Sequence, residues 1–201
     1  MGMTHLRFAL QILLMMIYSS FFATYAAAAQ QENTEPLLSY SAVQLIDTLP
    51  GPFVNKIYVS GDKERQDASL GGKVVTTIIR RDKGVAWLLI PSSKQYQEVE
   101  LDAAQLASIQ AQFPDANKRL LGKEKLNARH TQKYAYSDVD GRDLGLTWVT
   151  NGVVVKSEIF EDLDNGKPKA TIRLKNLKFG EQQASLFEIP SGYLKQNAES
   201  F

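Results

Sequence analysis

The sequence predicts a mainly β domain: a large antiparallel sheet that is strongly curved or closed into a barrel, with one helix packed over it. Turn signals recur at short intervals between segments rich in Val, Ile, Thr, Tyr and Trp, a pattern typical of short strands. The number of these segments is large for a flat open sheet, so it favours a strongly curved one. A single amphipathic segment between two groups of strands predicts the helix.

The strands are separated by compact turns, of which TNG at 150–152 and DNG at 164–166 are the clearest, because Asn-Gly tolerates positive backbone angles. The predicted strands are 40–48, 53–60, 64–70, 73–81, 85–90, 95–100, 119–126, 130–138, 145–150, 153–161, 168–179 and a short piece at 185–189. The segment 37–47 also fits a helix, but its β-branched and aromatic residues favour a strand.

The predicted helix occupies LDAAQLASIQAQFP, 101–114. Asp102 is placed to cap its N-terminus, and Pro114 ends it. Leu106, Ile109 and Phe113 share one stripe that can lie on a sheet.

The stretch GVAWLLIPSSKQYQEV, 84–99, opens on six consecutive apolar residues. A strand with one solvent-exposed face would alternate apolar and polar residues. The strand at 85–90 does not, so both of its faces need to be covered by other parts of the protein. The helix can cover either Trp87 and Leu89 or Leu88 and Ile90, and a sheet that curls on itself gives the other face an interior. The sequence leaves open whether that interior is filled or hollow.

The segment TIRLKNLKFG, 171–180, indicates where the sheet bends. Ile172 and Leu174 keep the period of two, but Leu177 and Phe179 are shifted by one residue. This shift predicts a bulge near 175–176 or a strand that changes face, since bulges bend sheets. The alternative is an exposed Leu177.

Residues 1–29 predict a cleaved signal peptide: a short start with Arg7, an apolar run, and alanines ending at Ala29. A retained membrane anchor is the alternative, although Gln11 and the serines interrupt the run. Residues 30–201 then form one domain. The absence of cysteine excludes disulfides and a lipidated cysteine, and fits an exported, soluble protein of a bacterial periplasm.

Charge and motifs exclude several function classes. Without Arg7 the 23 basic residues become 22, against 22 acidic ones, and both signs are interspersed, which argues against nucleic acid or an anionic membrane as the main partner. His130 is the only histidine after the leader, and no catalytic motif accompanies it. The acidic segments 137–143 and 161–166 lack calcium-loop spacing and fit turns better. No two carboxylates stand out as a hydrolase pair. We therefore expect no enzyme, metal or cofactor.

Several segments together resemble an uncharacterised family of exported bacterial domains. That family is commonly grouped with the periplasmic lipoprotein carriers and receptors LolA and LolB. The segments are IYVSGDKERQ (57–66), TTIIRRDKGVAWLLIPSSKQYQEVEL (76–101), LGKEKLNARHTQKYAY (121–136), LTWVTNGVVVKSE (146–158) and LKNLKFGEQQASLFEIPSGYLK (174–195).

The resemblance implies a LolA/LolB-like half-barrel whose apolar interior holds acyl chains beneath a lid. From this resemblance we expect a non-enzymatic carrier that binds a lipid or a lipidated protein. The candidate cavity residues are Trp87, Leu89, Tyr96, Trp148 and Phe160. Arg65 is the candidate lid latch, with a plain exposed arginine as the alternative. The alternative function for the same fold is a docking or sensor module that binds other envelope proteins and has a filled core and no lipid.

Overall fold

The computed structural model describes residues 38–48, 51–70, 72–110, 113, 116–160 and 167–196; the expected leader, 1–29, lies outside them. The strands are β1 Ser39–Thr48, β2 Gly51–Ser60, β3 Lys63–Leu70, β4 Lys73–Arg80, β5 Val85–Ile90, β6 Gln95–Glu100, β7 Asn117–Leu126, β8 Arg129–Ser137, β9 Asp143–Thr150, β10 Val153–Ile159, β11 Ala170–Phe179 and β12 Leu194–Lys195. The helical elements are η1 Arg81–Lys83, α2 Ala103–Gln110 and η3 Ala184–Phe187.

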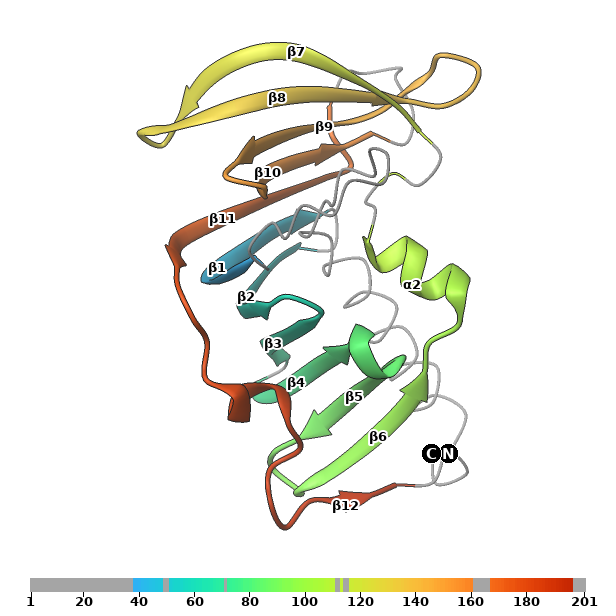
Figure 1. The fold of residues 1–201 in the computed structure, drawn as a ribbon, viewed down its shortest axis with the longest axis vertical. Helices are drawn as coiled ribbons and strands as arrows, with labels where there is room; N and C mark the ends of the chain where they lie inside the picture. Colours follow the sequence, from blue (N-terminus) through green and yellow to red (C-terminus); the bar gives the residue numbers. More distant parts are fainter. Residues whose placement is uncertain are drawn as a thin grey trace, which may run out of the picture.

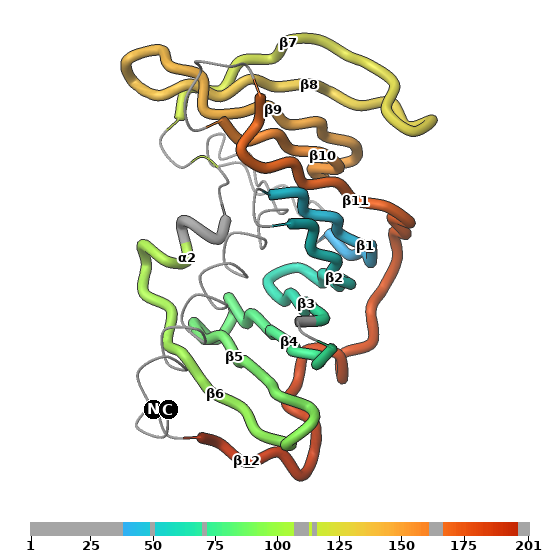
Figure 2. Tube along the Cα trace, turned by 180° about the vertical axis from the view of Figure 1, so that it is seen from behind, coloured from blue at the N-terminus to red at the C-terminus, as the bar shows by residue number. Residues whose placement is uncertain are grey.

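These strands form one 12-stranded sheet in the order β12-β6-β5-β4-β3-β2-β1-β11-β10-β9-β8-β7. All neighbours pair antiparallel except β12, which adds two parallel residues to β6. The sheet bends along its length, and its two ends, β7 and β12, lie far apart in both views (Figures 1 and 2). The predicted fold class, a curved and unclosed antiparallel sheet with one helix, is confirmed.

Most predicted strands are confirmed, including the ambiguous segment 37–47, which contributes β1. The strand predicted at 185–189 is wrong, because η3 covers Ala184–Phe187 instead. Its apolar residues pack onto the sheet rather than extend it, and Pro190 has no N–H to offer a ladder.

Cross-strand register defines two faces of the sheet. Tyr58, Arg65, Ile78 and Trp87 are successive partners across β2 to β5 and therefore share one face, which we call the tail face. The opposite face, here the helix face, carries the alternating row Val59, Glu64, Ile79 and Ala86.

The helix α2 lies over the helix face. A capping box begins it: the backbone N–H of Gln105 donates to Asp102 Oδ1 at 2.7 Å, and the Asp102 N–H donates to Gln105 Oε1 at 2.8 Å. Leu106 then packs against Ile79 and Ala86. The predicted cap is therefore present, and the helix covers the Ala86 side of β5 rather than the Trp87 side.

Phe113, beyond α2, also lies on the helix face. Its ring centroid is 4.7 Å from that of Tyr136. Position 145 must be glycine, because a Cβ there would lie 2.2 Å from the Phe113 ring and 2.6 Å from the Glu158 carbonyl oxygen.

The predicted bulge in β11 is confirmed. Val43 pairs with Lys175 and Ser41 with Lys178, so Ala42 alone faces two residues of β11. Asn176 takes up the extra length with φ of 53°, a conformation that asparagine tolerates. Leu177 is consequently buried, at 7% exposure, and the alternative of an exposed leucine is wrong.

Candidate functional site

Three of the residues selected from the sequence come together on the tail face. Trp87 and Leu89 are buried in one cluster, and Tyr96 packs against it. The C-terminal tail, defined as residues 180–196, covers this cluster, and its Phe187 is 1% exposed. The remaining contributors are Ile78, Tyr58, Val85, Leu186, Ile189 and Tyr193. The tail therefore covers the second face of β5, a contact that the residue pattern of β5 does not predict.

Two arginines on the tail face hold the tail by its backbone. Arg65 Nη1 donates to the Leu186 carbonyl oxygen at 3.2 Å, and Arg80 Nη1 donates to the Phe187 carbonyl oxygen at 3.2 Å. Arg80 also pairs with Glu188 at 2.5 Å. Arg65, proposed as a latch for a lid, therefore contacts the tail, and it lies on the face of the sheet opposite the one that α2 covers. Arg80 was missed because its sequence context, RRDKG, predicts only a turn.

Carboxylates fix both guanidinium groups in place. Arg80 donates through Nε and Nη2 to the two oxygens of Asp82, at 2.8 and 2.7 Å, a bidentate pairing that restricts its orientation. The hydrogen bond from Arg80 is the main reason that the pKa of Asp82 lies below its ordinary value. Arg65 Nε donates to Asp67 Oδ1 at 2.9 Å.

We expect Arg80→Met to lower the free energy of unfolding by about 2 kcal/mol and Arg65→Met by about 1 kcal/mol, because Arg80 makes additional charged hydrogen bonds. Urea denaturation measures both. Hydrogen exchange at 186–188 should accelerate more in the Arg80 variant. Arg142→Met, at a side chain 72% exposed, is the control and should change stability by less than about 0.5 kcal/mol. Equal losses in all three variants would contradict the anchoring role.

Trp148 and Phe160 do not join the tail cluster. Trp148 is 3% exposed and belongs to the cluster formed by β1, β2, β10 and β11. Its Nε1 donates to Glu124, and the ammonium groups of Lys133 and Lys156 lie 4.7 and 4.1 Å from its ring centroid. Phe160 is half-buried after β10. The five candidate residues are therefore distributed over separate parts of the sheet.

The helix face combines apolar and polar rows. Ala42, Ile57 and Val59 lie on it beside Leu174 and Leu177 of β11, all 7% exposed or less. Interleaved with them are polar residues that bond to one another. Asn55 donates to Gln44 at 3.1 Å, and Gln66 donates to Glu64 at 2.7 Å.

Glu64 and Arg81 form a buried ion pair on this face. Arg81 Nη2 lies 3.2 Å from Glu64 Oε2, and both side chains are 4% exposed. Burial raises the pKa of Glu64, and the Arg81 charge opposes that rise. Tyr40, completely buried in the same region, has a pKa raised well above its usual range, mainly by burial.

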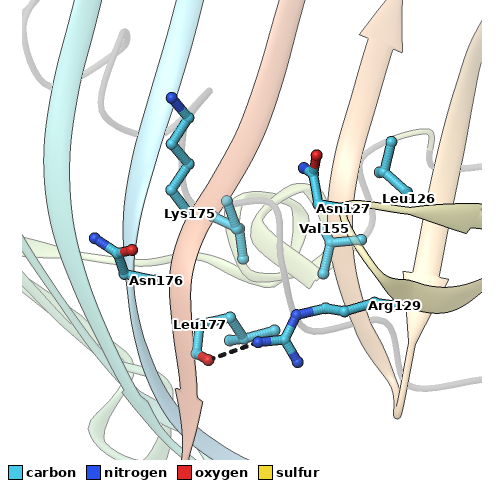
Figure 3. Close-up of a pocket in the computed structure, with 8 residues that line it drawn as sticks. Leu126, Asn127, Arg129, Val155, Lys175, Asn176 and Leu177 are labelled. Carbon is cyan, nitrogen blue, oxygen red and sulfur yellow. Dashed lines mark hydrogen bonds between the residues drawn. The ribbon is translucent and has the colours of Figure 1, made fainter.

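A pocket of about 370 Å³ lies where three irregular backbone features meet (Figure 3). These are the β7–β8 turn, with Asn127 at φ 49°, the bulge at Val155 in β10, and the bulge at Asn176. Arg129 reaches from the hairpin to the Leu177 carbonyl oxygen at 3.0 Å, while the Lys175 ammonium points away (Figure 3). The lining is completed by Leu126, Leu174, Lys175 and Leu177, and it contains no carboxylate.

Within the described ranges, no three His, Asp or Glu side chains gather as metal ligands would. The same part of the chain has no helix with the length and apolar character needed to cross a bilayer.

The model of the family described as domain of unknown function DUF4412 matches residues 51–170, more than half of the chain. The chain belongs to the DUF4412 family. A comparison with curated proteins gave no match.

The fold of this DUF4412 chain is similar to that of an uncharacterised conserved protein from Thermus thermophilus, with a TM-score of 0.57, 12% identity, and coverage of 80% of this chain and 91% of that one. It is also similar to MucB in a complex with MucA(peri), with a TM-score of 0.52 and 16% identity. That match covers 78% of this chain but only 56% of MucB. A LolA superfamily protein from Nitrosomonas europaea matches at a TM-score of 0.36 and 11% identity, over 76% of this chain and 91% of that one.

Proposed function

We propose that this protein is a non-enzymatic, exported periplasmic carrier that binds a hydrophobic ligand, an acyl chain or the lipid of a lipidated protein, on the helix face of its sheet. The supporting observation is that the sheet is curved and unclosed and carries apolar side chains on that face. Among the side chains of α2 that the structure describes, Leu106 packs on the sheet at the β4 and β5 end. Burial of an acyl chain would contribute about 0.8 kcal/mol per methylene.

The helix face is preferred over the tail face as the ligand surface. On the tail face, Phe187 already fills the space in front of Trp87 and Leu89. A ligand at Trp87, Leu89 and Tyr96 would first have to displace the tail and break its bonds to Arg65 and Arg80. That displacement would subtract from any binding energy.

The test begins with the chain from Gln30 onward, purified from a bacterial periplasm and extracted with organic solvent for mass spectrometry. The proposal expects stoichiometric phospholipid or fatty acid. Ala42→Phe would fill the apolar row beside Ile57 and should weaken uptake of a fluorescent fatty acid by about tenfold or more. Ala135→Phe, at a position on the opposite face, is the matched control. Lipid-free protein that takes up no probe while keeping its melting temperature would refute the carrier.

A docking or sensor module without lipid is the second candidate, and one observation favours it. The buried bonds of Asn55 to Gln44 and of Gln66 to Glu64 place amides and a carboxylate on the helix face. An acyl chain cannot satisfy such groups, whereas a packed protein core can. The same extraction discriminates the two, since a docking module would yield no lipid.

A further inference from the structure

The strand β7 forms an edge of the sheet. It stands last in the strand order and pairs over its length with β8. At the other edge, β12 already pairs with two residues of β6. Among the described residues no strand pairs with the outer side of β7, so it presents unpaired backbone N–H and C=O groups that another extended segment can bond.

The β7–β8 hairpin also concentrates positive charge. Residues 117–137 contain six cations and one carboxylate, a net of +5, whereas the whole chain has a formal net charge of +1. Four of the cations, Lys118, Arg119, Lys123 and Lys125, lie on β7 itself and are exposed. The carboxylate, Glu124, accepts a hydrogen bond from Trp148 Nε1.

Two large apolar residues accompany this charge. Leu120 and Leu121 are 51% and 43% exposed on β7. Charged residues alone are enough to protect a strand edge from pairing, so the exposed leucines need another explanation. A further strand added beside β7 would extend the sheet, and its side chains could cover these leucines.

We propose that β7 binds an extended acidic segment of a partner protein by adding it to the sheet as a further strand. Cross-strand neighbours of opposite charge stabilise such pairing. A second copy of this chain is a poor occupant, because pairing β7 with itself would place cations opposite cations. The edge is therefore open to an acidic partner and closed to self-association.

The test uses the chain from Gln30 onward and a fluorescent ten-residue peptide that alternates Asp or Glu with Val or Thr. Binding should weaken at least about tenfold in a Lys118→Glu, Lys123→Glu, Lys125→Glu variant, because three favourable charge pairs become repulsive. The matched control reverses three exposed lysines elsewhere, Lys56, Lys73 and Lys178, and should bind within about twofold.

A second peptide, N-methylated at every residue so that neither of its edges can donate backbone hydrogen bonds, separates strand addition from simple charge attraction. Strand addition predicts that this peptide fails to bind, because it cannot complete the backbone ladder. Equal binding of the two peptides would overturn the proposal, as would no binding of either. Binding of vesicles containing anionic phospholipid in place of the peptide would also overturn it, in favour of a membrane surface. The triple lysine variant should keep any lipid that the wild-type chain carries, so this proposal and the carrier proposal can fail separately.

Discussion

Replacement of Phe187 with alanine is expected to lower the free energy of unfolding by about 3–5 kcal/mol, the range for removing a buried phenylalanine. Phe187 is 1% exposed and packs against Ile78, Trp87 and Leu89 on the tail face. The strand pairing between the tail and the sheet is confined to the two residues of β12, so no regular ladder replaces that contact. Chemical denaturation monitored by tryptophan fluorescence measures the loss, because Trp87 lies in the same cluster.

Leu194→Ala is the control for this prediction. Leu194 belongs to the same tail but is 69% exposed, so its truncation should change stability by less than about 0.5 kcal/mol. Limited proteolysis gives a second readout: the Phe187 variant should be cut within 180–196 before the sheet unfolds. A Phe187→Ala variant as stable as the wild type would show that the tail is not part of the folded core.

The strands were predictable because their sequences alternate and end at turn residues that require particular backbone angles. The bulge was predictable for the same reason. Leu174 and Leu177 are three residues apart, whereas apolar residues on one face of a regular strand are separated by multiples of two. The tail was not predictable in this way. The run LFEI at 186–189 is as apolar as a short strand, and periodicity alone cannot distinguish an added strand from a turn packed onto a face.

The candidate site was less predictable than the fold. Alternation correctly places Trp87 and Leu89 on the same face as each other, but it does not say what covers that face. The residues that decide this, Arg65 and Arg80, lie 121 and 107 positions from their carbonyl partners in the tail. Such contacts depend on tertiary structure, which brings β3 and β4 against η3. Resemblance suggested a latch role for Arg65 but not its partner.

Replacement of Arg81 with methionine is expected to lower the free energy of unfolding by about 3–5 kcal/mol at pH 7, because it leaves the Glu64 carboxylate buried without its counter-charge. Arg81 and Glu64 are both 4% exposed, and Gln66 supplies the other hydrogen bond to the carboxylate. Methionine keeps most of the apolar volume of the arginine stem, so the loss reports mainly on charge. Urea denaturation as a function of pH measures it.

The pH dependence of this variant follows from the pKa of Glu64, which burial raises above its ordinary value of 4.5 and which Arg81 holds down. A carboxyl group whose pKa is higher in the folded state than in the unfolded state loses stability as the pH rises from the unfolded value through the folded one. Removal of Arg81 raises the folded pKa further, so the loss should be small near pH about 4 and grow toward pH 7. The Glu64→Gln, Arg81→Met double variant, with no buried charge, should recover most of the stability at pH 7. A loss in Arg81→Met that is the same at both pH values, or is not recovered by the double variant, would show that the arginine stabilises the fold by packing rather than by neutralising Glu64.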